Sequence, residues 1–98
     1  MRLHEMFQKL VAMILHTTEV SPFPGYRLFL RFNNGEAGEV DLADELYGDV
    51  FGPLRDPALF ATAYQHPVMR TVAWENGADL APEFLSNLLR EQQGNRAT

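Results

Sequence analysis

Residues 26–42 read YRLFLRFNNGEAGEVDL, which is two extended runs joined by Asn33-Asn34-Gly35. In the first run Tyr26, Leu28, Leu30 and Phe32 take one side and Arg27, Phe29 and Arg31 the other, the period of a strand that buries one face. The sequence Asn-Gly accepts the positive φ that a tight hairpin turn requires. The segment therefore predicts an antiparallel hairpin with strands over residues 26–32 and 36–42.

The residues before this hairpin predict another strand and an added helix. Residues 13–20 are rich in β-branched side chains, and residues 21–25, Ser-Pro-Phe-Pro-Gly, predict a break because proline cannot donate to a strand ladder. Further back, apolar residues recur at helical spacing and predict an amphipathic extension over residues 1–12. The apolar positions of this helical pattern are Leu3, Phe7, Leu10 and Val11, and the pattern runs on to Ile14.

The residues after the hairpin predict short helices and one more strand. Residues 43–47 form a helical turn that Gly48 would end, and Asp56-Pro57 places a cap and a first-turn proline at the start of a short helix. A strand over 71–74, a second Asn-Gly turn and a helix over 82–90 follow.

The predicted fold class is α+β: a small antiparallel meander-like sheet with short helices packed on one side. The expected organisation is an N-terminal amphipathic helical extension over residues 1–12, a single domain over 13–90 and a frayed tail over 91–98.

Composition narrows the classes of function. The 98 residues include 13 acids, 8 bases and no cysteine, for a net charge of −5, so thiol chemistry and cysteine metal sites are excluded. No apolar run reaches the length of a membrane span, and Glu5 and Lys9 interrupt the only signal-like region. We expect a cytoplasmic protein without a membrane partner, and natural translation could start at Met1 or at Met13.

Acids gather between Phe32 and Leu54, where the chain has no base. This asymmetry suits a basic protein partner and argues against direct nucleic-acid binding, although such acids also serve as an ordinary solvated face. The predicted partner surface consists of Glu36, Glu39, Asp41, Asp44 and Glu45.

The chain shows no local catalytic or metal-binding motif. Its histidines, His4, His16 and His66, lack metal-ligand spacing, and its serines lie in no nucleophile motif. His16, His66 and Asp41 could still meet in three dimensions as a metal site, and the simpler alternative is that the histidines are surface or edge residues. We therefore expect no catalytic residues, no metal and no cofactor. An alternative is a small-ligand pocket near Trp74, Asn76 and Asp79. The simpler interpretation is that Trp74 is a core residue.

Three blocks together carry a family resemblance: residues 26–42, residues 50–60 (VFGPLRDPALF) and residues 71–82 (TVAWENGADLAP). They resemble the bacterial domain-of-unknown-function family 2442. The resemblance implies a small α+β domain with a meander-like sheet and no established catalytic residues. Some members precede a helix-turn-helix domain, and others are suspected members of toxin–antitoxin-like gene pairs. This chain differs at Glu75, where proline is frequent, in residues 1–12, and in lacking a helix-turn-helix after the last helix.

The leading hypothesis is a non-catalytic protein-interaction domain, either antitoxin-like or a regulatory partner. The alternatives are a ligand-binding protein or small enzyme using the Trp74 pocket, and a homodimer formed through residues 1–15.

Overall fold

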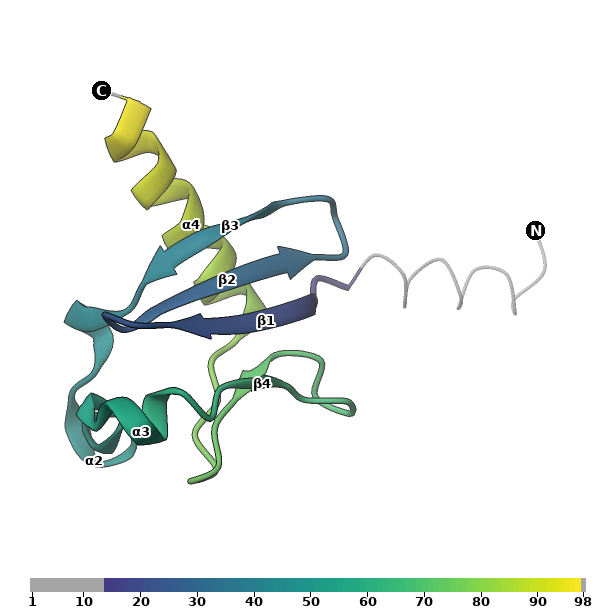
Figure 1. Cartoon of the computed structure of the whole chain (residues 1–98). Helices are drawn as coiled ribbons and strands as arrows, with labels where there is room; N and C mark the ends of the chain where they lie inside the picture. Colours follow the sequence, from purple (N-terminus) through teal and green to yellow (C-terminus); the bar gives the residue numbers. More distant parts are fainter. Residues whose placement is uncertain (1–13, 98) are drawn as a thin grey trace.

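A computed structural model describes residues 14–97, so the helix predicted over residues 1–12 lies outside the described residues. Three antiparallel strands form a meander in the order β1-β2-β3 (Figure 1). Their bounds are Thr17–Phe23, Arg27–Phe32 and Ala37–Asp41. The predicted hairpin is confirmed, and Gly35 takes a φ of 92° in its turn.

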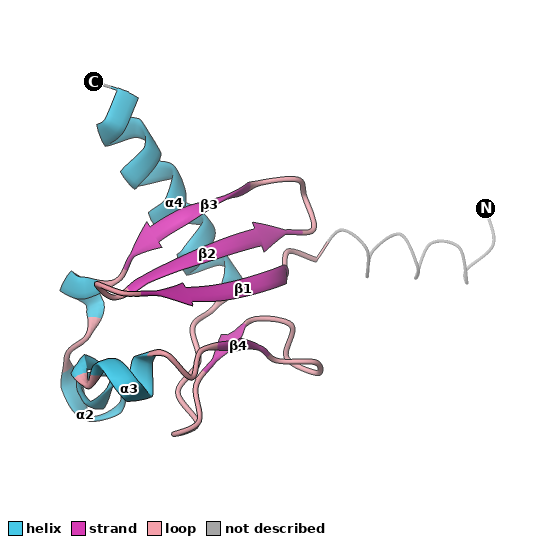
Figure 2. Cartoon of the chain, in the orientation of Figure 1, coloured by secondary structure: helices cyan, strands magenta, loops and turns pink. Residues whose placement is uncertain are grey.

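The alternation in β2 places its apolar side chains in the core. Leu28, Leu30 and Phe32 are buried, whereas Arg27 and Arg31 are exposed. Helix α4, Pro82–Ala97, crosses the buried face of the sheet (Figure 2). Its buried leucines share one core cluster with the strand residues. The α+β class is therefore confirmed, with one hydrophobic core that the sheet and α4 share with residues of the short helical segments and of the region around Trp74.

The break predicted at residues 21–25 is wrong in position. Strand β1 continues through Pro22, which lies opposite Leu28, and ends at Phe23. An edge strand tolerates proline because a ring nitrogen that faces away from the neighbouring strand removes no ladder hydrogen bond. The chain turns only after Phe23, where Gly25 and Tyr26 adopt φ values of 84° and 61°.

Short helical segments link the meander to a second, two-stranded sheet. Gly48 does not end the preceding turn as predicted. Its φ of 84° reverses the chain, and α2 begins there. Asp56 caps α3 as predicted, accepting a hydrogen bond from the Ala58 N–H at 3.0 Å. In order, the segments are η1 (Ala43–Glu45), α2 (Gly48–Phe51), η2 (Gly52–Arg55), α3 (Pro57–Phe60), β4 (Tyr64–Gln65) and β5 (Val72–Ala73).

Helix α4 continues to Ala97, past the end predicted at Arg90 and into the predicted frayed tail. The turns of α4 beyond Arg90 contact the sheet through side-chain hydrogen bonds. The Gln92 side chain accepts a hydrogen bond from Asp41 N–H at 2.8 Å and donates one to Asp41 C=O at 2.9 Å. These contacts stabilise a helical segment whose own sequence is polar.

Glutamine amides engage both edges of the three-stranded sheet. Gln92 pairs with the backbone of β3, and Gln65 of β4 donates to the Thr17 carbonyl of β1. A side-chain amide offers an N–H group and a C=O group, as the backbone of a neighbouring strand residue does. These side chains thus occupy part of each edge that another strand would otherwise reach.

Candidate functional site

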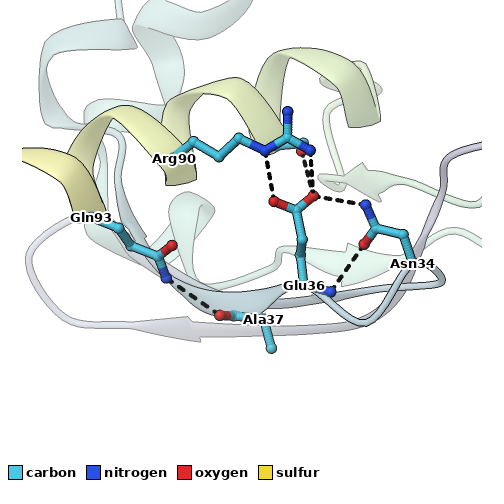
Figure 3. Close-up of polar contacts among 6 residues, drawn as sticks. Asn34, Glu36, Ala37, Arg90 and Gln93 are labelled. Carbon is cyan, nitrogen blue, oxygen red and sulfur yellow. Dashed lines mark hydrogen bonds and ion pairs between the residues drawn. The ribbon is translucent and has the colours of Figure 1, made fainter.

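Glu36 lies just before β3, and its carboxylate joins the hairpin to α4 (Figure 3). Arg90 Nε is 2.8 Å from Glu36 Oε2, and Ser86 Oγ and Asn34 Nδ2 each donate to Oε1 at 2.8 Å. The hydrogen bond from Arg90, followed by that from Asn34, lowers the pKa of Glu36 to about 2. The structure therefore engages this predicted surface residue in an internal contact.

Two more of the predicted acids also have internal partners. Glu39 Oε1 is 2.7 Å from Arg27 Nη1 on the exposed side of the sheet. Asp41 Oδ1 accepts a hydrogen bond from Ala43 N–H at 2.9 Å and so shapes the turn after β3. Both side chains are solvent-accessible, and they can still contribute to the potential of a surface.

Asp44 and Glu45 differ, because within residues 14–97 neither side chain forms an ion pair or a hydrogen bond. Glu45 lines a groove of about 240 Å³ between η1, α2 and the start of α4. We call this feature the acid-rimmed groove. It is lined by Glu45, Tyr47, Phe51, Leu80 and Phe84.

Large apolar side chains of this groove reach solvent. Tyr47 is 69% exposed and Phe84 is 37% exposed. Asp44, Asp49 and Glu83 are exposed and lie within two residues of a lining residue in the chain. An apolar surface that is lined by the Glu45 carboxylate and has further acids close by in the chain is a chemically specific place for a partner to bind.

An apolar pocket of about 310 Å³ lies where the tip of the β1–β2 hairpin meets α3. Tyr26 and Phe60 line it and pack edge to face with ring centroids 5.5 Å apart. The Tyr26 hydroxyl donates to the Arg55 carbonyl, so this polar group is already occupied.

A polar pocket of about 330 Å³ lies between the start of β1 and the β4–β5 loop. It brings His16 and His66 together with Arg70, which sequence reasoning did not include in any site, and not with Asp41. The two histidines are 50 residues apart, and no local spacing announces that β1 and β4 are neighbours. Only the tertiary structure reveals this grouping.

The residues of the predicted Trp74 pocket serve the core and a turn. Trp74 is 1% exposed, and its indole N–H donates to the Phe60 carbonyl at 3.0 Å. Asn76 Oδ1 accepts from Ala78 N–H at 3.1 Å, and Asp79 forms a backbone bridge with Ala73. None of the three lines the pockets described above.

Residues 14–97 contain no group of three or more His, Asp or Glu side chains placed to hold a metal ion. Over the same residues, no helix has the length and apolar character needed to cross a bilayer.

Comparison with solved structures finds a similar fold in the crystal structure of "Putative DNA Binding Protein NE0471" from Nitrosomonas europaea ATCC 19718. The TM-score is 0.72 at 27% identity, and the match covers 83% of this chain. The chain spans about half of that protein, 52% of its length. No curated protein matches the chain. The family described as "Protein of unknown function (DUF2442)" matches residues 17–91, and the chain belongs to this family.

Proposed function

We propose that this domain is a non-catalytic protein-interaction module that binds a basic partner segment at the acid-rimmed groove. The observation that carries the proposal is the position of exposed aromatic side chains beside acids that have no basic partner in the described residues. The proposal keeps Asp44 and Glu45 of the predicted surface as its binding residues. It assigns Glu36 mainly to the internal contact with α4.

The chemistry of the groove defines the partner. Tyr47 and Phe84 offer apolar area, so the partner presents at least one large apolar side chain. The carboxylates favour Lys or Arg on either side of that side chain, and their long-range attraction mainly raises the association rate. In binding such a segment, this chain would itself act as an antitoxin-like or regulatory protein, and the proposal assigns the complex to the cytoplasm.

The test is affinity capture of the full chain in the cells that encode it, with cross-linking to identify the bound segment. We expect a stoichiometric partner that is cross-linked through a basic segment. Tyr47→Ser should weaken its binding about thirtyfold, as expected for loss of an interface anchor. Glu45→Lys should weaken it several-fold, mostly through the association rate.

Glu91→Lys is the matched control, because it makes the same charge change at an exposed α4 residue outside the groove. The control should retain the partner at wild-type affinity. If no stoichiometric partner is found, or if Tyr47→Ser and Glu91→Lys retain it equally, the proposal fails.

Two competing functions, DNA binding and small-ligand binding, predict different observations. The name of the Nitrosomonas europaea protein suggests DNA as a ligand of that protein, and the expectation that this chain does not contact nucleic acid directly stays a prediction. Nuclease treatment before capture should leave the protein complex intact. A small-ligand site near Trp74 would instead require a metabolite that changes the fluorescence of this buried indole.

A further inference from the structure

We propose that the polar pocket between the start of β1 and the β4–β5 loop binds an oxyanion of the phosphate class, with Arg70 as its main ligand. The pocket is lined in part by His16, His66 and Arg70, and none of the described lining residues is acidic. In Figure 1 the β4–β5 loop and the start of β1 lie at one end of the domain and α2 at the other. The site is therefore separate from the acid-rimmed groove.

The side chain of Arg70 is available for a ligand. Arg27, Arg31 and Arg90 form ion pairs, and Arg55 donates to the Leu46 carbonyl. Among the arginines whose side chains the structure describes, Arg70 has no side-chain hydrogen bond or ion pair with another described residue. A guanidinium offers several N–H donors in a planar fork that matches phosphate oxygens.

The backbone of Arg70 is fixed while its side chain remains free. Its N–H donates to the His66 carbonyl at 2.9 Å, and its carbonyl accepts from Thr17 N–H at 3.1 Å. Its φ is 54°, a conformation that costs most residues roughly 1 kcal/mol and that glycine or asparagine adopts more easily. Stability alone therefore does not favour arginine here, and a ligand contact would offset the cost.

The hydrogen bonds of the two histidines determine which ring nitrogen of each is a donor and which is an acceptor. His66 Nδ1 accepts from the N–H groups of Val68 and Met69 at 3.2 and 3.0 Å, so the ring proton is assigned to Nε2, which is a donor. His16 Nδ1 lies 3.0 Å from the Ile14 carbonyl and must donate to it. Arg70 and His66 thus offer a cationic and a neutral donor to the same pocket.

The size of the pocket fits a phosphate group together with part of the molecule that carries it. Its volume of about 330 Å³ lies at the lower end of the range for small-ligand sites. A free phosphate ester and a nucleic-acid backbone share the chemistry that this site recognises. The experiment therefore distinguishes these two sources.

The full chain is titrated with sodium phosphate at constant ionic strength, and the ring signals of His16 and His66 are followed by NMR. We expect saturable shifts that sodium chloride alone does not produce. Arg70→Asn should weaken binding at least about tenfold, because a charge-assisted contact is lost. This variant should fold at least as well as the wild type, since asparagine tolerates the positive φ.

Arg27→Asn is the control, because it removes the same charge at the first residue of β2, which does not line the pocket. This variant should change the phosphate affinity less than twofold. A second arm repeats the titration with glycerol 3-phosphate and with a short DNA duplex. Tighter binding of either ligand, abolished by Arg70→Asn, supports the site and identifies its source. Absence of saturable phosphate binding, or equal binding by wild type and Arg70→Asn, overturns the proposal.

Discussion

Glu36 shows how one carboxylate can connect two parts of a small domain. Its pKa falls to about 2 from 4.5 because Arg90 and Asn34 donate hydrogen bonds to the charged form. The unfolded chain therefore takes up this proton at a higher pH than the folded chain does. The stabilisation is fully present above about pH 4.5 and is lost as the pH falls towards 2.

We predict that Glu36→Gln lowers the free energy of unfolding by about 1–3 kcal/mol at pH 7, because hydrogen bonds to a charged group are lost. Urea unfolding from pH 2 to pH 7 should also show a flatter pH dependence than the wild type below pH 4.5. Glu91→Gln, at an exposed residue on the same helix, should change stability by less than about 0.5 kcal/mol. An unchanged acid slope in Glu36→Gln would contradict this role.

At the scale of elements, α4 packs closely against β3 at Gly38. A Cβ atom at this residue would lie 2.8 Å from Leu89 Cδ1 and 2.8 Å from Gln93 Nε2. The Gln93 side chain can move, but Leu89 is 1% exposed and packed in the core. Glycine is therefore needed here for space between the helix and the strand.

We predict that Gly38→Ala destabilises the domain by about 1–3 kcal/mol, the usual cost of overpacking. Gly52→Ala is the matched control, because a Cβ there meets nothing within 4 Å and the residue has a helical φ of −53°. The control should be neutral or slightly stabilising. Thermal unfolding of both variants tests this prediction. Equal melting temperatures would contradict the close approach of Leu89 to Gly38.

The hydrogen bonds from Gln92 make a second prediction at this scale. Gln92→Ala should leave the Asp41 N–H without its side-chain acceptor, so this amide should exchange with solvent faster. Hydrogen exchange measured by NMR tests this, with Glu91→Ala as a neighbouring control. Unchanged protection of Asp41 would mean that Gln92 does not hold the edge of β3.

Local sequence patterns predicted the elements that depend on residues close together in the chain. The alternation of β2, the Asn-Gly turn and the Asp56 cap all depend on neighbours in the chain, and the structure confirms them. The extension of α4 past Arg90 depends on Asp41, some fifty residues earlier, and so had no local signal. The pocket at Arg70 was missed for the same reason, because it requires β1 and β4 to lie together.

At the scale of the whole molecule, the two proposed sites differ in charge and position. The acid-rimmed groove favours a cationic partner, and the Arg70 pocket favours an anion. The protein as a whole carries a net charge of −5, so the second site must attract its ligand locally against a repulsive background. Raising the ionic strength should therefore weaken partner binding at the groove more than it weakens phosphate binding at Arg70.

The apolar stripe of residues 3, 7, 10, 11 and 14 makes a final prediction about assembly. Its last member, Ile14, is 61% exposed in the described residues. An isolated amphipathic helix of this length is marginal in water and needs an apolar surface, which a second copy of the same stripe can supply. Light scattering should give twice the monomer mass for the full chain and the monomer mass for a chain that begins at Met13. Leu10→Glu should produce the same loss of mass in the full chain, whereas Gln8→Glu, the same charge change outside the stripe, should not. Equal masses for the full and shortened chains would mean that residues 1–12 do not form the interface between copies.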